Sequence, residues 1–257
     1  MGRLTGKTAI VTGAGRGIGA CIAERFAQEG ASVAILEIDA ASGHAQAAKI
    51  TKASGTCASF DCDVTDPESV GHAVADAKAT FGPANVLVNN AGANVFHKPH
   101  EMPEGAWEKC LRLDLDSAWH CARAVLPQMR QQQQGSIINI ASTHSFQIIP
   151  HTFPYPVAKH GLIGLTRALA VEYARVNIRV NAIAPGYIET QLARDYWAGF
   201  PDPAAERQKA LDLHPPGRIG QPVEVANTAL FLASDEAPFI NAETITVDGG
   251  RSKIYHE

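Results

Sequence analysis

The chain has 257 residues, of which 46% are hydrophobic and 19% are charged. This apolar content is too high for a disordered chain and is enough to bury a sizeable core. The net charge of −4 argues against a surface that binds nucleic acid or an anionic membrane, because such surfaces usually carry a basic face. We therefore expect a globular protein whose partner is a small molecule, with no nucleic acid and no membrane.

Short β-branched runs with few charges alternate along the chain with longer amphipathic segments. The runs predict strands at residues 8–12, 32–36, 57–61, 86–89, 135–140, 179–183 and 244–247. The segments between them predict helices at residues 17–28, 40–53, 67–80, 104–129, 155–173 and 223–233. This alternation predicts an α/β fold, with a doubly wound parallel sheet, helices on both faces and a single domain over residues 1–257.

Two longer stretches interrupt the alternation. The first, which we call the substrate loop (residues 144–154), is rich in His, Phe and Pro, and the second, the lid segment (residues 186–220), holds several aromatic residues and prolines. Long irregular segments in a compact domain tend to be functional loops. Both follow predicted strands, so we expect them beyond the carboxyl ends of the sheet, where open α/β sheets bind ligands.

The five cysteines are scattered, and no two form a CxxC pair. They indicate neither a disulfide framework nor a zinc site. His97 and His100 lack a third ligand at suitable spacing, so we expect no metal. The N-terminal residues have no long apolar stretch, and the chain has no run near the ~20 apolar residues of a membrane helix. We expect a cytoplasmic location.

A glycine-rich turn joins the first predicted strand to the first predicted helix. Such a turn lets the backbone approach a pyrophosphate, which then sits on free N–H groups at the helix N-terminus. The residues that would form this cradle are Gly13, Arg16, Gly17, Ile18 and Gly19. Glu37, at the end of the second strand, can accept hydrogen bonds from ribose hydroxyls and would repel a 2′-phosphate. The cofactor is therefore expected to be NAD, although the Arg16 guanidinium could pair with the 2′-phosphate of NADP.

Ser142, Tyr155 and Lys159 form a second group. Tyr155 and Lys159 are four residues apart, hence on one face of a helix that starts at Tyr155. An ammonium beside a phenol stabilises the phenolate and lowers its pKa from ~10. Such a tyrosine can take a proton from an alcohol, while Ser142, which follows a buried strand, could orient the substrate oxygen.

These motifs occur in one order along nearly the whole chain: Thr12-Gly13-x-x-x-Gly17-x-Gly19, Asn89-Asn90-Ala91-Gly92, Ser142, Tyr155-x-x-x-Lys159 and Pro185-Gly186. Together they resemble the short-chain dehydrogenase/reductase family. The resemblance implies a Rossmann-type sheet of seven strands, hydride transfer with NAD(P), and a homotetramer. It makes Tyr155 the general acid/base and Ser142 the holder of the substrate oxygen. Lys159 would contact the nicotinamide ribose.

The resemblance also assigns further cofactor contacts. It places Asp63 and Val64 beside the adenine and gives Asn90 a supporting role. It directs Ile188 and Thr190 to the nicotinamide carboxamide. The motif residues Ala91, Gly92, Pro185 and Gly186 complete the implied cofactor site.

One position departs from the family pattern. The family usually has a catalytic Asn seven residues after the Trp of the preceding helix, and here Asp114 stands there. Asn offers a donor and an acceptor, whereas an ionised Asp only accepts. Asp114 could hold a relay water beside Lys159 and favour its ammonium form, or it could be a structural replacement.

The loops carry the expected substrate contacts, namely Ser142, His144, His151, Tyr155, Tyr187 and Trp197. Hydrogen-bonding groups mixed with aromatic faces suit a sugar or polyol, although the histidines could equally be ordinary loop residues. The main hypothesis is an NAD-dependent oxidation of a secondary alcohol or hemiacetal. The alternatives are an NADPH-dependent reductase of ketones or acyl thioesters, a non-catalytic dinucleotide-binding protein, and an epimerase or dehydratase.

Overall fold

A computed structural model describes residues 2–254 of the chain, and it contains one large parallel sheet. The strand order is β3-β2-β1-β4-β6-β8-β9, and every neighbouring pair runs parallel. The strands are β1 (Thr8–Thr12), β2 (Ser32–Glu37), β3 (Thr56–Asp61), β4 (Val86–Asn89), β6 (Gly135–Ile140), β8 (Ile178–Pro185) and β9 (Thr244–Val247). The predicted sheet of seven strands is confirmed, and its three central strands β1, β4 and β6 are buried at every residue, as in a sheet covered on both faces.

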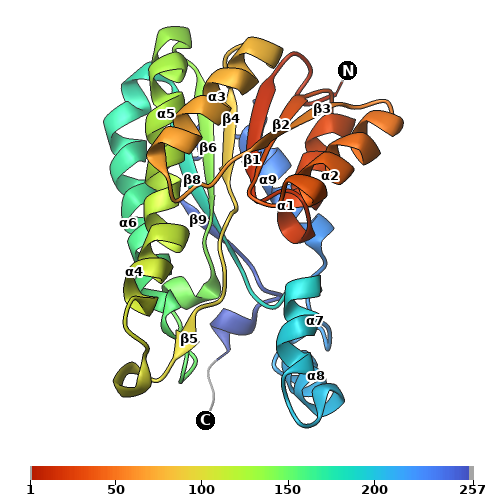
Figure 1. The fold of residues 1–257 in the computed structure, drawn as a ribbon, viewed down its shortest axis with the longest axis vertical. Helices are drawn as coiled ribbons and strands as arrows, with labels where there is room; N and C mark the ends of the chain where they lie inside the picture. Colours follow the sequence, from red (N-terminus) through yellow and green to blue (C-terminus); the bar gives the residue numbers. More distant parts are fainter. Residues whose placement is uncertain (1, 255–257) are drawn as a thin grey trace.

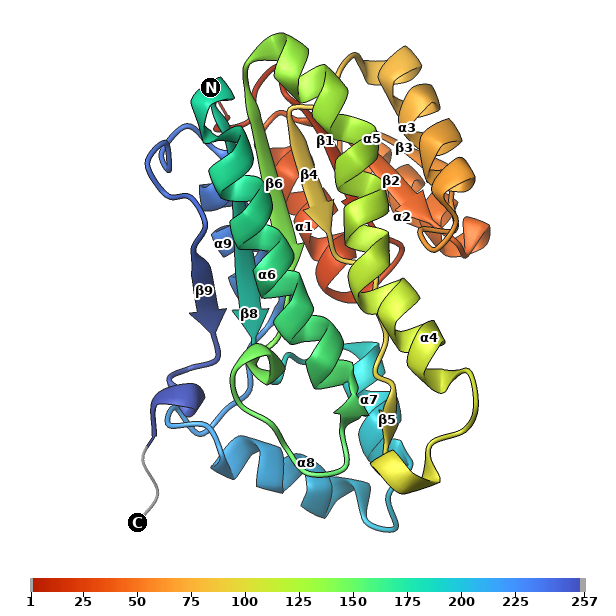
Figure 2. The ribbon, with the colours of Figure 1, turned by 90° about the vertical axis from the view of Figure 1, so that its left-hand side faces the viewer.

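Helices cover both faces of the sheet, which confirms the predicted fold class (Figures 1 and 2). On one face lie α1 (Gly17–Gln28), α2 (Ala40–Lys52) and α9 (Pro222–Ala233), which share one apolar core with alternate side chains of the strands. On the other face lie α3 (Pro67–Phe81), α5 (Ser117–Gln132) and α6 (Tyr155–Tyr173), which share a second core. In the described part of the chain, no helix combines the length and the apolar character needed to cross a membrane.

The prediction of one regular helix over residues 104–129 is wrong. This stretch consists of α4 (Ala106–Leu111), a π-helical turn (Arg112–Asp116) and α5, which continues to Gln132. A π-turn inserts one extra residue and rotates its side chains relative to a regular helix. Here the π-turn buries the carboxylate of Asp114, whose side chain has no exposed surface. The apolar pattern runs through the turn, so periodicity could not reveal it.

The lid segment is more ordered than the sequence indicates, because it contains α7 (Gln191–Ala198) and α8 (Pro203–Asp212). The Thr190 side chain caps α7 by accepting a hydrogen bond from the Ala193 amide. The Asp202 side chain caps α8, and Pro203 occupies its first turn. Both helices project beyond the carboxyl ends of the strands (Figures 1 and 2).

Two very short strands, also not foreseen, pair in an antiparallel manner at the same end of the molecule. They are β5 (Phe96–His97), which follows β4, and β7 (Phe153–Pro154), which directly precedes α6. This pairing brings Phe96 beside the N-terminus of α6 and ties the substrate loop to the segment after β4.

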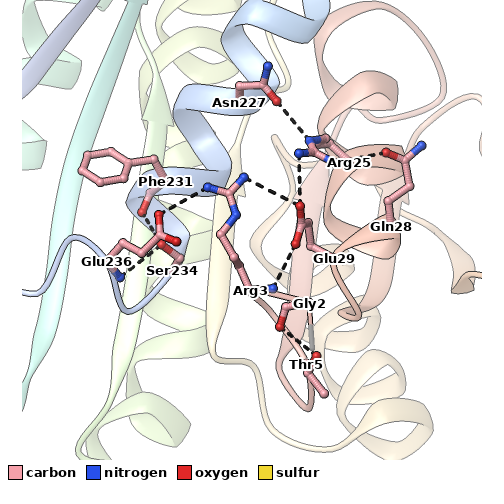
Figure 3. A network of polar contacts seen from close by, with 10 residues as sticks. All are labelled: Gly2, Arg3, Thr5, Arg25, Gln28, Glu29, Asn227, Phe231, Ser234 and Glu236. Carbon is pink, nitrogen blue, oxygen red and sulfur yellow. Dashed lines mark hydrogen bonds and ion pairs between the residues drawn. The ribbon is translucent and has the colours of Figure 1, made fainter.

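The N-terminal segment is fastened to α1 and to the residues after α9 (Figure 3). The Arg3 amide donates to the Glu29 carboxylate at 2.9 Å, and the Arg3 guanidinium lies 3.3 Å from Glu236. Arg25 pairs with Glu29 at 3.1 Å and donates to the Asn227 side chain at 3.0 Å. These contacts lie at the end of the sheet away from the predicted site, so they support the fold and not the chemistry.

Candidate active site

Most of the predicted site residues lie at or after the carboxyl ends of strands. Because the sheet is parallel, these ends lie along one edge, and the strand order reverses between β1 and β4. Ligands of open α/β sheets bind in the crevice at such a reversal. The topology thus places the glycine turn after β1 next to the segment after β4.

The glycine turn has the backbone shape that the motif predicts. Gly13 and Gly17 have φ values of +60° and +62°, in the left-handed region that side chains disfavour. Arg16 is the N-cap of α1 but makes no side-chain cap, so the first-turn amides keep no side-chain partner. Gly19 is buried against Asn90 and lies where a Cβ would come 2.5 Å from the Gly13 carbonyl. These amides and the absence of Cβ atoms fit a pyrophosphate at the start of α1.

Asn90 holds the glycine turn from the neighbouring strand. Its side-chain amide donates to the carbonyls of Thr12 and Gly13, at 2.9 Å each. The Thr12 hydroxyl in turn accepts hydrogen bonds from the amides of Asn90 and Ala91 at 3.0 Å. The supporting role implied for Asn90 therefore has a concrete form, since it ties the turn to β4.

Glu37 points from the end of β2 into the glycine turn. Its carboxylate accepts hydrogen bonds from the Gly15 amide at 2.9 Å and from the amides of Ile38 and Asp39 at 3.1 and 3.3 Å. These donors fix a negative charge, 9% exposed as a residue, beside the cradle. A carboxylate in this place fits a ribose with free hydroxyls better than a phosphorylated one. Arg16, the competing cation, is exposed on the same turn.

The remaining residues implied for the cofactor surround the same crevice. The Asp63 carboxylate accepts from the amide and the hydroxyl of Thr65, while Val64 is buried. On the lid side, Ile188 is buried, and the methyl group of Thr190 lies 3.7 Å from the position of a Cβ on Gly17. The base of the lid therefore lies directly beside the glycine turn.

Ser142, Tyr155 and Lys159 meet at the other side of the crevice. Ser142 follows β6, and its hydroxyl accepts from the His144 amide at 3.2 Å. Tyr155 is the first residue of α6, with Pro156 in the first turn, and Lys159 lies one turn later. The Lys159 ammonium lies 5.3 Å from the centroid of the Tyr155 ring and donates to the Ile140 carbonyl at 3.3 Å.

Asp114 forms a buried ion pair with Lys159. The Asp114 Oδ1 atom lies 3.3 Å from the Lys159 ammonium and accepts from the Ala93 amide at 3.2 Å. Gly92 permits this approach, because a Cβ there would lie 2.6 Å from the same oxygen. Burial raises the pKa of the Asp114 carboxyl, with Lys159 opposing it. Burial also acts to lower the pKa of Lys159, but the charges of Tyr155 and Asp114 outweigh it and raise that pKa.

The pKa of Tyr155 is raised, which differs from the expectation that Lys159 brings it down. Burial is the largest cause, and the negative charge of Asp114 adds to it. Lys159 and the Ser142 hydroxyl both lower the Tyr155 pKa, as expected, without outweighing burial. The difference arises mainly because burial disfavours the phenolate, and Asp114 adds to it by offsetting part of the positive charge of Lys159.

The substrate side of Tyr155 is aromatic. The His144 and Phe96 rings lie 5.7 and 5.6 Å from the Tyr155 ring, both edge to face, and 6.2 Å from each other. The Tyr196 ring of α7 lies 6.1 Å from Phe96. Burial and the charges of Arg251 and His160 lower the pKa of His144 to about 4, so its ring is neutral near neutral pH. Sequence reasoning missed Phe96 and Tyr196, because neither belongs to a motif.

The other residues expected to contact substrate divide into two groups. Tyr187 is half-buried. The centroid of its ring lies 5.9 Å from that of the His214 ring and 5.0 Å from the guanidinium of Arg251. Trp197 is instead buried in the small apolar core of the lid, and His151 is exposed at a turn of the substrate loop. The structure therefore brings His144 to Tyr155 but does not bring Trp197 or His151 to it.

Comparison with known proteins gives close matches over the full chain. A family model described as enoyl-(acyl carrier protein) reductase matches residues 13–252. An uncharacterized oxidoreductase of Thermotoga maritima is 40% identical over 99% of this chain and 100% of its own. A 3-oxoacyl-[acyl-carrier-protein] reductase of Chlamydia trachomatis is 38% identical over 97% of this chain and 98% of its own. A D-threitol dehydrogenase of Mycolicibacterium smegmatis is 36% identical over 96% of this chain and 94% of its own.

Solved structures agree with these matches. A protein described as a short-chain dehydrogenase/reductase of Burkholderia xenovorans superposes with a TM-score of 0.96 at 41% identity, over 100% of both chains. A variant of the actinorhodin polyketide ketoreductase with NADPH superposes with a TM-score of 0.93 at 31% identity. It covers 96% of this chain and 98% of the ketoreductase.

Proposed function

Because this chain belongs to the short-chain dehydrogenase/reductase family, an oxidoreductase family, we propose that it oxidises a secondary alcohol or hemiacetal of a small polar substrate, a sugar or polyol, with NAD. The observation that carries the proposal is the grouping of Ser142, Tyr155 and Lys159 across the crevice from a glycine turn whose inner side holds the Glu37 carboxylate.

The chemistry follows from the side chains at the crevice. Ser142 would hold the substrate hydroxyl, and Tyr155 would accept its proton as the carbonyl forms. The Lys159 ammonium favours the phenolate of Tyr155, while Asp114 keeps that ammonium charged. Bound NAD would supply the acceptor for the hydride that leaves the carbon. The glycine turn, Glu37, Asn90 and Thr190 would hold it.

The sugar or polyol class is supported by the mixture of groups around Tyr155 and by a relative. His144 and Ser142 offer polar atoms, and Phe96 and Tyr196 offer aromatic faces that can pack on the apolar side of a sugar ring. The relative from Mycolicibacterium smegmatis is named a D-threitol dehydrogenase.

A reductase that uses NADPH is the second candidate. The relative from Chlamydia trachomatis is named a 3-oxoacyl-[acyl-carrier-protein] reductase, and the actinorhodin ketoreductase was solved with NADPH. The exposed Arg16 could serve a 2′-phosphate. A location in the cytoplasm, a homotetramer and a single domain over residues 1–257 complete the proposal.

The mechanism predicts the behaviour of Tyr155→Phe. Removing the phenolic oxygen leaves the ring contacts but takes away the proton acceptor, so turnover should fall by about 10²–10⁴-fold. The measurement is NADH formation over a panel of sugars, polyols, hydroxy acids and steroids, with NAD binding followed by fluorescence as the control. Full activity in this variant would refute the proposed role of Tyr155, and oxidation of bulky apolar alcohols alone would refute the sugar or polyol class.

Glu37 predicts the choice of cofactor. Glu37→Gln removes the charge that repels a 2′-phosphate while keeping the size of the side chain, so the ratio of kcat/KM for NAD over that for NADP should fall by about tenfold or more. The matched control is Glu24→Gln on α1, which is paired with Lys49 away from the crevice. A wild-type protein that prefers NADP would overturn the NAD proposal and favour the reductase.

A further inference from the structure

The segment after β9 folds back over the substrate side of the molecule. The Asp248 carboxylate accepts hydrogen bonds from the amides of Gly250 and Ser252, at 2.9 and 2.8 Å, and so starts a 3₁₀ turn (Arg251–Lys253). The Gln147 side chain donates to the Ser252 carbonyl at 2.6 Å. Figure 1 shows this turn as the last coloured coil before the C-terminal trace. The turn is therefore fixed to the substrate loop.

Arg251 points from this turn to the Tyr187 ring of the lid segment. Its guanidinium lies over the Tyr187 ring, and its charge contributes to lowering the pKa values of both His144 and His214. His144 contacts Tyr155, so the charge of Arg251 acts on a ring that touches the reacting tyrosine. An arginine stacked on an aromatic face keeps its planar fork of N–H donors free for a ligand.

Among the described residues, the Arg251 guanidinium has no carboxylate as an ion-pair partner. Within residues 2–254, no Asp or Glu lies within ion-pair distance of Arg251, and Asp248 is directed to backbone amides. Lys159, the cation beside Tyr155, is buried and paired with Asp114. His144 is neutral near neutral pH. One half-buried positive charge thus remains on the substrate side.

We propose that Arg251 binds a carboxylate of the substrate, so that the substrate is a hydroxy acid, such as a polyhydroxy acid, and not a neutral sugar. This inference rests on the proposed alcohol oxidation and specifies its substrate class. A single guanidinium matches one planar carboxylate in a bidentate pair. A phosphate, with its larger charge, generally takes several cationic or amide donors. In the described residues Arg251 is the one cation over the Tyr187 ring, since Lys253 of the same turn lies over Phe146 instead.

The test uses pairs of substrates that differ in charge alone. Hydroxy acids of increasing length are each compared with the corresponding carboxamide, which has the same shape, and with polyol phosphates, in assays of NADH formation. We expect each preferred acid to exceed its amide by about 10- to 100-fold in kcat/KM, mainly through KM. Arg251→Gln should remove this preference and leave the amide within about threefold of wild type, while Arg251→Lys should restore only part of it.

Lys253→Gln is the matched control, because it removes a positive charge from the same turn at a side chain that lies over Phe146. It should keep the preference for the acid. Equal efficiency of acids and amides in the wild-type protein would overturn the inference and leave the proposed oxidation standing. A preference for phosphates, or an equal loss for acid and amide in Arg251→Gln, would also overturn it.

Binding measurements separate this inference from the proposed function. If no alcohol in the panel yields NADH, the proposed oxidation fails, and calorimetric titration of the NADH-loaded protein with the same acids and amides then decides the role of Arg251. Acid binding that weakens by about tenfold or more in Arg251→Gln supports an anion site without turnover. Equal binding of acids and amides, or no binding of either, refutes it.

Discussion

Asp114 changes the electrostatics of the reacting group. A carboxylate in the place of the usual amide raises the pKa values of both Lys159 and Tyr155, because a negative charge favours the ammonium and disfavours the phenolate. The ion pair therefore favours the charged form of Lys159 and disfavours the phenolate form of Tyr155. The structure places Asp114 in an ion pair with Lys159, and both interpretations open from the sequence, a role beside Lys159 and a structural replacement, remain predictions.

Asp114→Asn should move the pH profile of alcohol oxidation. Without the negative charge the pKa of Tyr155 falls, so the acidic limb of kcat/KM, where the phenolate is lost, should shift to lower pH. Stability should decrease by about 1–3 kcal/mol, because Lys159 stays buried without its counter-charge. The measurement is kcat/KM against pH together with urea unfolding.

Asp116→Asn, on the same π-turn, provides the control for Asp114→Asn. Within residues 2–254, Asp116 forms no ion pair or hydrogen bond with Lys159, so the pH profile of Asp116→Asn should match wild type. A profile that does not move in Asp114→Asn would show that the carboxylate has no special part in the proton transfer.

At the scale of elements, close packing sets the shape of the cofactor crevice. The start of α1 approaches β4 so closely that Gly19 touches the Asn90 side chain and the Gly13 carbonyl. Glycine motifs in sequence signal this approach, and the structure identifies what each glycine meets. In contrast, Gly71 on α3 is exposed and has no atom within 4 Å of a Cβ position.

These two helical glycines should respond oppositely to alanine. Gly19→Ala drives a methyl group into Asn90 and the turn backbone, so it should weaken NAD binding by about tenfold or more and destabilise the fold by about 1–3 kcal/mol. Gly71→Ala meets open space and restricts the unfolded chain, so it should stabilise by about 0.5–1 kcal/mol. Thermal unfolding and NAD titration measure both, and a Gly19→Ala protein that binds NAD normally would contradict the close packing.

At the scale of the whole molecule, burying a titratable group in its neutral form makes the free energy of unfolding depend on pH. The pKa of His144 is about 4 in the folded protein, against 6.5 for an ordinary histidine. Between these values the unfolded chain binds a proton that the folded chain does not. Because the unfolded state binds more protons there, stability is greatest above pH about 6.5 and falls as the pH decreases toward about 4.

His144→Gln should therefore reduce the acid sensitivity of the fold. The fall in Tm from pH about 6.5 to about 4 should be smaller in the variant than in wild type, as measured by calorimetry. His72→Gln, at an exposed position of α3, serves as the control for loss of an imidazole. Parallel Tm curves for wild type and His144→Gln would show that His144 does not govern this dependence.

Local patterns determined the repeated elements of this protein. Alternating strands and helices predicted the sheet, and β1, β4, β6 and β9 have the predicted bounds. The π-turn, the lid helices and the β5–β7 pair escaped prediction, because their stability depends on tertiary contacts and not on periodicity. The glycine turn and the Tyr155–Lys159 spacing were readable because each lies within one strand-to-helix junction or one helix turn.

Only the tertiary structure decided how the charges combine. Three contacts join residues that are far apart in the chain. Asp114 is buried against Lys159, Glu37 accepts a hydrogen bond from the Gly15 amide, and Arg251 lies over the Tyr187 ring. Charge interactions depend on distance and on burial, and neither can be read from spacing along the chain. Length, composition and motifs thus determined the fold class and predicted the chemistry and the location of the site, while only the tertiary structure sets the distances and the burial on which the ionisation of its groups depends.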